Sequence, residues 1–146
     1  MLHFSSMELR IKKLHPDAKI PTYAHAGDAG FDLYAIESVT IPVGTRVLVG
    51  TGIAMEIPDG YAGLAWDKSG LSNNHGLKTL GGVMDAGYRG EIKVGVVNLG
   101  ERDYTIEAGH KIAQVVIQKV ERAEIKEVAE LSDTVRGHGG FGSTGK

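Results

Sequence analysis

The order of apolar and polar positions along the chain predicts many short strands separated by turns. The segment from residue 8 to residue 14 begins with alternating polar and apolar residues, which is typical of a strand with one buried face. Similar apolar segments recur at residues 31–35, 39–41, 46–49, 53–57, 61–66, 92–97, 104–106 and 111–120. Turn residues such as Pro58-Asp59-Gly60 interrupt them about every 8–12 residues. This spacing favours an all-β fold, a jelly-roll-like sandwich or barrel.

Glycine-rich stretches mark the places where the chain is expected to reverse direction. Residues 42–45 indicate a hairpin-type connection between two predicted strands. Residues 81–91 predict a tight hairpin, because the glycines at positions 81, 82, 87 and 90 allow positive φ. Residues 124–131 have a weak helical spacing, but their β-branched residues favour an extended segment.

Composition divides the chain into three parts. Residues 1–6 are expected to form a disordered N-terminal extension. Residues 7–131 contain no linker or internal repeat and should fold as one jelly-roll domain. Residues 132–146 should form a flexible C-terminal tail, because residues 136–146 carry five glycines and show no periodicity.

Charge and cysteine content narrow the classes of function. The net charge is -2 with both signs spread along the chain, so a nucleic-acid groove binder is not expected. No apolar run approaches the ~18 residues of a membrane span, and the first residues lack the features of a secretory signal. The absence of cysteine excludes disulfides, thiolate zinc sites and a cysteine nucleophile. It fits a reducing compartment, and we expect a cytoplasmic location.

Two carboxylates lie where they could carry chemistry. Asp85 and Tyr88 share the glycine-rich loop, whose backbone could pair with a flat heterocycle while the ring supports a sugar and the carboxylate holds a water. An ordinary turn with a solvated aspartate is the alternative. Asp32 has apolar neighbours, so its charge must be paired or hydrogen-bonded unless it is a solvated residue at a strand end.

Two further segments offer groups that bind anions. Ser69-Gly70 can begin a short helix whose first N–H groups point at an anion, and Lys68 adds a positive charge. The tail combines Arg136 for phosphate oxygens, Phe141 for stacking, and hydroxyl and glycine N–H groups. A tail that orders over a ligand would act as a lid. An inert tail would account for the glycines but not for a phenylalanine among them.

Taken together, five segments resemble in order and spacing the five motifs of the trimeric dUTP diphosphatases (dUTPases). They are residues 29–33, 68–71, 82–90, 109–114 and 136–145, and the resemblance extends from about residue 8 to the C-terminus. The third and fifth are highly specific. The resemblance implies a jelly roll of the dUTPase-like β-clip type, assembled as a homotrimer whose active sites are shared between chains. It also implies hydrolysis of dUTP to dUMP and pyrophosphate with Mg²⁺, which limits uracil in DNA and supplies dUMP for dTMP synthesis.

The resemblance also assigns roles to residues. Asp85 resembles the residue that orients and deprotonates the attacking water, and Tyr88 the ring beneath the deoxyribose. Asp32 resembles the carboxylate that meets the metal indirectly, through water. The remaining expected substrate contacts are Gly82, Val83 and Met84 at the uracil, Lys68, Ser69, Gly70, Gln114, Arg136, Ser143 and Thr144 at the phosphates, and Phe141 and Gly142 over the base.

The second segment departs from the family pattern. Lys68 stands where the family usually has arginine, so the charge is kept but the bidentate fork is lost. Asp67 stands where the family has proline, and it could pair with Lys68, pair with another cation or help to hold a metal.

Two other functions are compatible with this scaffold. A dCTP deaminase-like enzyme would carry a general-base glutamate ten residues after the hairpin aspartate, where this chain has Gly95. A non-catalytic dUTP-binding module would not need an intact Asp85, Tyr88, Gln114 and Phe141. Release of ammonia from dCTP would identify the first, and dUTP binding without pyrophosphate release the second.

Overall fold

A computed structural model describes residues 7–145, so the expectation for residues 1–6 lies outside the described part of the chain. Within this part the chain forms eleven strands and one short helix. They are β1 (Arg10–Lys13), β2 (Phe31–Tyr34), β3 (Val39–Ile41), β4 (Arg46–Gly50), β5 (Ile53–Glu56), β6 (Tyr61–Trp66), α1 (Ser69–His75), β7 (Leu77–Leu80), β8 (Val83–Met84), β9 (Lys93–Asn98), β10 (Tyr104–Ile106) and β11 (Lys111–Lys119). The predicted strands are confirmed, whereas β7 and β8 were not predicted as strands.

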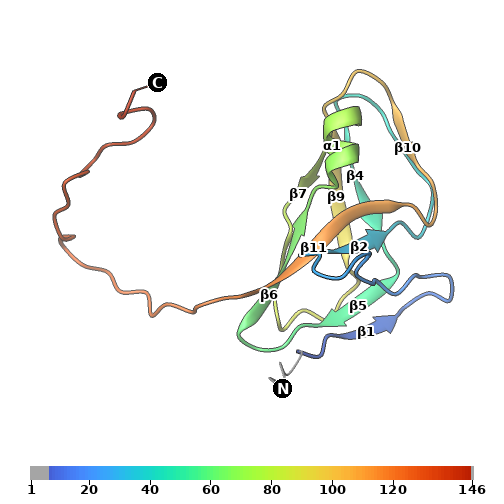
Figure 1. Cartoon of the computed structure of the whole chain (residues 1–146), viewed down its shortest axis with the longest axis horizontal. Helices are drawn as coiled ribbons and strands as arrows, with labels where there is room; N and C mark the ends of the chain where they lie inside the picture. The colour runs from blue at the N-terminus through green and yellow to red at the C-terminus, as the bar shows by residue number, and fades with distance from the viewer. Residues whose placement is uncertain (1–6, 146) are drawn as a thin grey trace.

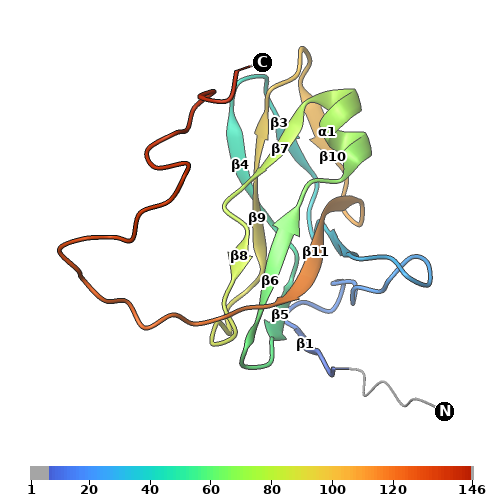
Figure 2. The same ribbon diagram turned by 60° about the vertical axis from the view of Figure 1, so that its left-hand side comes forward.

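The strands form four antiparallel sheets around one core (Figure 1). The larger sheets have the strand orders β2-β11-β6-β8 and β4-β9-β7. Two strand pairs, β1-β5 and β3-β10, complete the body, and α1 lies at one end (Figure 2). The all-β, jelly-roll-like fold expected from the turn spacing is therefore confirmed.

The core is built from every second residue of the strands, the ones that face inward. In β11, Ala113 and Val115 are fully buried, whereas Gln114 between them is only partly buried. In β2, Phe31 and Leu33 join the same apolar cluster. Because successive side chains of a strand point to opposite faces, Asp32 and Gln114 share the outer face of this sheet, where they are register partners.

Of the two predicted hairpins, only the one at residues 81–91 joins antiparallel partners, β7 and β9, and its loop is long rather than tight. β8 pairs with β6, whereas β9 pairs with β4 and β7, so the chain crosses between sheets in residues 85–92. Residues 42–45 make a turn, but β3 pairs with β10 and β4 with β9. Turn residues specify a local change of direction, whereas strand partners are chosen by burial of distant apolar faces.

After β11 the chain runs away from the body (Figures 1 and 2). Residues 121–138 are exposed and contain neither helix nor strand, which confirms that residues 124–131 are not helical. The expected domain boundary at residue 131 falls inside this exposed segment and stays a prediction. Within residues 7–145, no helix combines the length and apolarity needed to cross a bilayer.

Candidate active site

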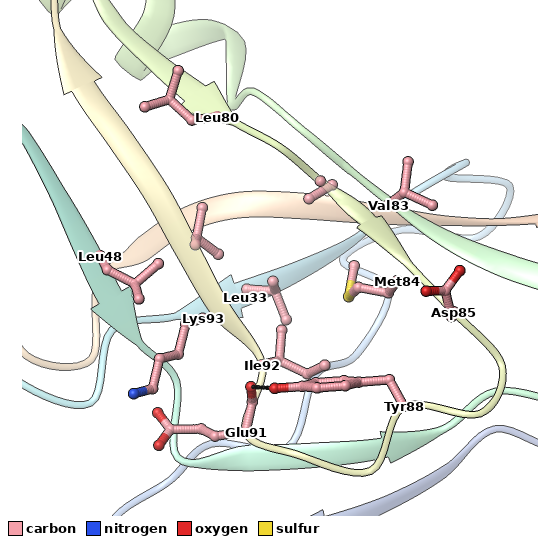
Figure 3. Close-up of a pocket in the computed structure, with 13 residues that line it drawn as sticks. Leu33, Leu48, Leu80, Val83, Met84, Asp85, Tyr88, Glu91, Ile92 and Lys93 are labelled. Atoms are coloured by element: carbon pink, nitrogen blue, oxygen red, sulfur yellow. Dashed lines mark hydrogen bonds between the residues drawn. The ribbon is translucent and has the colours of Figure 1, made fainter.

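A cavity of about 290 Å³ opens between the two larger sheets and contains Asp85 and Tyr88 (Figure 3). Its apolar wall includes Leu33, Leu48, Leu80, Ile92 and Val94. The backbone of β8 forms one side, and Asp85 follows it at the exposed rim. Apolar walls with a few polar groups at the edge are typical of a small-molecule site.

The position of the β8 backbone depends on Gly82. The Ala65 N–H of β6 donates to the Gly82 carbonyl at 2.8 Å, and Gly82 has φ +116°. A Cβ at this position would lie 2.9 Å from the Ala65 carbonyl oxygen. Only glycine therefore lets β8 approach β6 this closely.

The ring of Tyr88 is held by its own loop. Its hydroxyl donates to the Glu91 carbonyl at 2.9 Å, and 49% of the residue remains exposed. A Cβ on Gly90 would lie 2.5 Å from the Tyr88 hydroxyl oxygen, so a side chain there would displace the ring. The ring is thus fixed beside the cavity with part of its surface available to a ligand.

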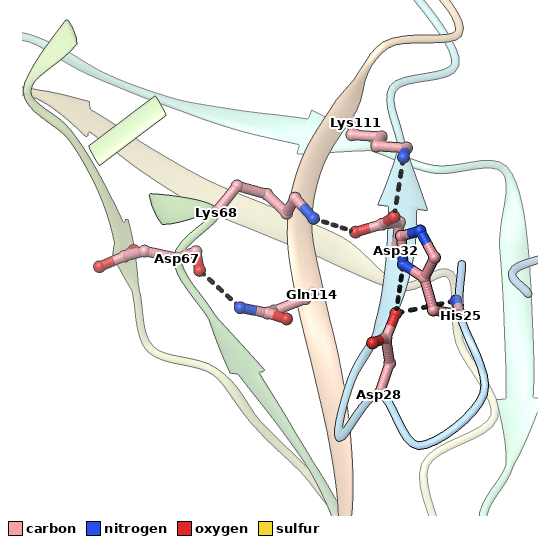
Figure 4. A network of polar contacts seen from close by, with 7 residues as sticks. All are labelled: His25, Asp28, Asp32, Asp67, Lys68, Lys111 and Gln114. Atoms are coloured by element: carbon pink, nitrogen blue, oxygen red, sulfur yellow. Dashed lines mark hydrogen bonds and ion pairs between the residues drawn. The ribbon is translucent and has the colours of Figure 1, made fainter. Parts of the chain in front are cut away.

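Asp32 lies outside this cavity, between two lysines (Figure 4). It is only 4% exposed, with Oδ1 at 2.6 Å from Lys68 Nζ and Oδ2 at 3.2 Å from Lys111 Nζ. Burial alone would raise the pKa of Asp32, but the hydrogen bonds and charges of both lysines outweigh it and hold the pKa below its usual value. Asp32 in turn raises the pKa of Lys111. The expectation that this carboxylate is paired is confirmed.

Asp67 pairs with a lysine that sequence reasoning did not single out. Its Oδ2 lies 2.9 Å from Lys78 Nζ, and its Oδ1 accepts the Thr79 N–H at 2.7 Å. Burial opposes the charge of Asp67, but the Thr79 N–H and Lys78 lower its pKa overall. The Asp67 carbonyl also accepts Gln114 Nε2 at 3.0 Å. These contacts anchor the loop that leads into α1.

Gln114 and Lys68 line an outer pocket of about 320 Å³ together with Asp32 and Lys111. A Cβ on Gly30 would lie 2.8 Å from Gln114 Oε1, so Gly30 makes room for this amide. Ser69 and Gly70 are exposed at the start of α1, which confirms that a short helix begins there.

Lys111 is a site residue that sequence reasoning missed. In a regular strand, residues 111 and 114 would point to opposite faces. β11 instead contains a register shift between Lys111 and Ala113, which is typical of a β-bulge. The bulge brings Lys111 and Gln114 into the same pocket. Lys111 does belong to the fourth motif-like segment, but the bulge has no clear sequence signal.

A single chain does not bring the predicted site residues together. Leu33 lines the cavity, whereas the preceding Asp32 lines the outer pocket, so these two sites lie on opposite faces of β2. In the tail, Arg136 Nε donates to the Gly139 carbonyl at 2.8 Å, and Phe141 is fully exposed. The three groups are Gly82, Val83, Met84, Asp85 and Tyr88 at the loop, Asp32, Lys68 and Gln114 at the outer pocket with Ser69 and Gly70 next to Lys68 at the start of α1, and Arg136, Phe141, Gly142, Ser143 and Thr144 in the tail.

Solved dUTPase structures share this fold. A variant of the Staphylococcus bacteriophage 80alpha dUTPase with dUpNHpp has a TM-score of 0.91 at 31% identity, covering 97% of this chain and 100% of that one. A variant dUTPase from phage phi11 of S. aureus, with a structural Mg(II) ion, has a TM-score of 0.79 at 29% identity and covers 85% and 98%. The fold thus defines a dUTPase-like all-β protein.

Sequence comparison agrees with this class. The dUTPase family model matches residues 16–145. The deoxyuridine 5'-triphosphate nucleotidohydrolase of Clostridium kluyveri is 50% identical over 141 residues, which are 95% of this chain and 99% of that protein. The protein of the same name from Wolinella succinogenes is 48% identical over 148 residues, with coverage of 100% and 99%. The chain belongs to the dUTPase family.

The lowered pKa of Asp67 predicts a pH-dependent contribution to stability. A carboxylate with a depressed folded-state pKa stabilises the fold above its unfolded value of 3.8, and this is lost as pH falls through the folded value. The variant Asp67→Asn should lower the free energy of unfolding by about 1–3 kcal/mol near neutral pH. Its melting temperature should then fall less than that of the wild type below about pH 4.

Thermal melts at several pH values would measure both effects. The matched control is Asp59→Asn, at an exposed turn, which should run parallel to the wild type. Identical acid profiles for Asp67→Asn and the wild type would contradict a stabilising contact with Lys78 and Thr79.

Proposed function

We propose that this protein hydrolyses dUTP to dUMP and pyrophosphate, through attack on the α-phosphate by a water that Asp85 orients. The supporting observation is the cavity in which the β8 backbone, the Tyr88 ring and the Asp85 carboxylate meet. The reaction would limit uracil incorporation into DNA and supply dUMP for dTMP synthesis. We place it in the cytoplasm or another reducing compartment, which the cysteine-free sequence suits.

The β8 backbone is suited to bind the uracil. β8 stands at the end of its sheet, so within residues 7–145 only one of its edges is paired with a strand. The N–H and C=O groups of Gly82, Val83 and Met84 can then offer donors and acceptors to the edge of a pyrimidine. Tyr88 would support the deoxyribose and leave no room for a 2′-hydroxyl group.

The chemistry requires positioning more than a strong base. Water attack on phosphorus depends on alignment and on stabilisation of charge. Asp85, exposed at the cavity rim, would accept the proton of the attacking water and hold it in line. The leaving pyrophosphate would be neutralised by the basic and hydroxyl groups of the outer pocket and the tail.

Mg²⁺ would supply charge neutralisation at the phosphates. Within residues 7–145 no three histidine or acidic residues gather as ligands, which fits an ion held through substrate oxygens and water. Asp32 fits poorly as a partner of that ion, because an ammonium group lies at each of its oxygens. In this proposal Asp32 therefore acts without contact to the metal.

A homotrimer would complete each site. The cavity and the outer pocket lie on opposite faces of β2, and no residue of the tail lines either of them. After β11 the tail runs away from the body (Figure 2). A site that combines the cavity of one chain, the outer pocket of a second and the tail of a third would join all three groups. Arg136, Ser143 and Thr144 would then meet the phosphates, and Phe141 with Gly142 would cover the base.

A substrate panel tests the proposed function directly. Pyrophosphate release from dUTP should exceed release from dCTP, dTTP and UTP by at least about 10²-fold. The polar edge of the base distinguishes dCTP, the 2′-hydroxyl distinguishes UTP, and the 5-methyl group of dTTP would clash with the close β8 backbone. Ammonia released from dCTP would instead identify a deaminase. Binding of dUTP without pyrophosphate release would identify a binding module.

The role of Asp85 predicts a selective loss of turnover. In Asp85→Asn, kcat for dUTP should fall by about 10²–10⁴-fold while KM changes little, because a general base acts in the transition state. Steady-state pyrophosphate release measures both constants. Asp59→Asn, an exposed aspartate outside the cavity, serves as the control and should retain wild-type values. A near-native kcat in Asp85→Asn would remove Asp85 from the mechanism.

Shared sites predict complementation between two inactive variants. Asp85→Asn and Lys68→Met chains, refolded together in equal amounts, should recover roughly a quarter of wild-type activity. Three quarters of randomly assembled trimers are mixed, and each mixed trimer has one of three sites with both residues intact. Activity measured before and after mixing provides the test. A mixture no more active than its parents would mean that both residues serve a site within one chain.

A further inference from the structure

The contacts of Asp32 differ from those of a carboxylate that faces a metal. Both of its oxygens are engaged by ammonium groups, and the residue is only 4% exposed (Figure 4). Mg²⁺ prefers unshielded oxygen ligands, and two ammonium groups at close range repel a divalent cation. Lys68 and Lys111 therefore balance the charge of this carboxylate.

The two lysines remain available to a ligand on their other sides. The side chain of Lys68 is 30% exposed and that of Lys111 is 49% exposed. An ammonium group has three N–H donors, so each lysine keeps donors beyond the one that points at Asp32. The other aspartate of the outer pocket, Asp28, accepts hydrogen bonds from the backbone and ring nitrogens of His25.

Lys68 and Lys111 also line a second, adjoining hollow. It has a volume of about 580 Å³ and shares only these two residues with the outer pocket. Its lining includes Lys19, His75 and His110 and no acidic residue. Lys68 and Lys111 thus border both hollows. The larger hollow is lined only by neutral and basic residues.

We propose that Asp32 is a positioning residue that holds Lys68 and Lys111 together as a clamp for the terminal phosphates of a nucleoside triphosphate, and that Lys111 is itself a phosphate contact. The inference rests on the proposed function. One guanidinium binds a phosphate with a planar fork, which a single ammonium cannot do. Two ammonium groups fixed on one carboxylate supply two donors in a defined geometry. Because Asp32 orders both side chains before the ligand arrives, less conformational entropy is lost on binding.

Binding of pyrophosphate to the full-length protein without metal tests the clamp. Isothermal titration calorimetry should show that Lys111→Met weakens binding by about tenfold or more, whereas Lys111→Arg stays within about threefold of the wild type. The control is Lys119→Met, an exposed lysine of the same strand, which should leave binding unchanged. Wild-type affinity in Lys111→Met would overturn the assignment of Lys111.

A second variant keeps the test valid if Lys111→Met fails to fold. The double change Asp32→Asn with Lys111→Met removes both partners, so that no buried charge is left uncompensated. It should fold, and it should bind pyrophosphate about as weakly as Lys111→Met. Wild-type affinity in the folded double variant would equally overturn the clamp.

Kinetics in Asp32→Asn separate the positioning role from a metal role. Without the carboxylate the two ammonium groups repel each other, so KM for dUTP should rise by about tenfold while the Mg²⁺ concentration for half-maximal activity stays within about twofold. If Asp32→Asn needs more Mg²⁺ at an unchanged KM, Asp32 acts on the metal and the positioning role is wrong. Pyrophosphate binding needs no turnover, so failure to cleave dUTP would refute the proposed function and leave the clamp testable.

Discussion

The arrangement of the outer pocket depends on one buried carboxylate, Asp32, which lies between two lysines. Asp32 is almost fully buried, and a charge in that position persists only when cations or donors surround it. Lys68 comes from the loop before α1 and Lys111 from the start of β11, so one side chain ties three separate parts of the chain together. The same contact places two ammonium groups at the edge of the outer pocket.

The alternation of β2 divides the functional groups between two surfaces. Leu33 faces the cavity of Asp85 and Tyr88, and Asp32 faces the lysines. Opposite faces of one strand cannot both meet the same small ligand, so in the proposed function each chain would contribute only part of a nucleotide site. The family relationship and the exposed tail agree with a site that neighbouring chains complete. The aspartate at position 67 of the second motif-like segment has a structural role, because it anchors its loop through Lys78 and Thr79.

Much of the fold and part of the site were predictable from local patterns. Alternating apolar residues located nearly all the strands, and the apolar neighbours of Asp32 correctly required a partner for its charge. Strand pairing was predicted less well. Residues 42–45 have the composition of a hairpin, yet the strands on either side join different sheets. Residues 81–91 do connect the paired strands β7 and β9, but through a long loop in which β8 joins another sheet. Lys111 was missed because a bulge reverses the side of the strand on which it lies.

The sequence by itself determined the all-β class, the turn positions, the motif order and the chemistry available in each motif, because these depend on residue type and short-range spacing. Only the tertiary structure decided which strands pair, which lysine meets Asp32 or Asp67, and which motifs share a surface. Those outcomes depend on contacts between residues far apart in the chain, where many pairings satisfy the same local preferences. Packing of the whole core selects one of them.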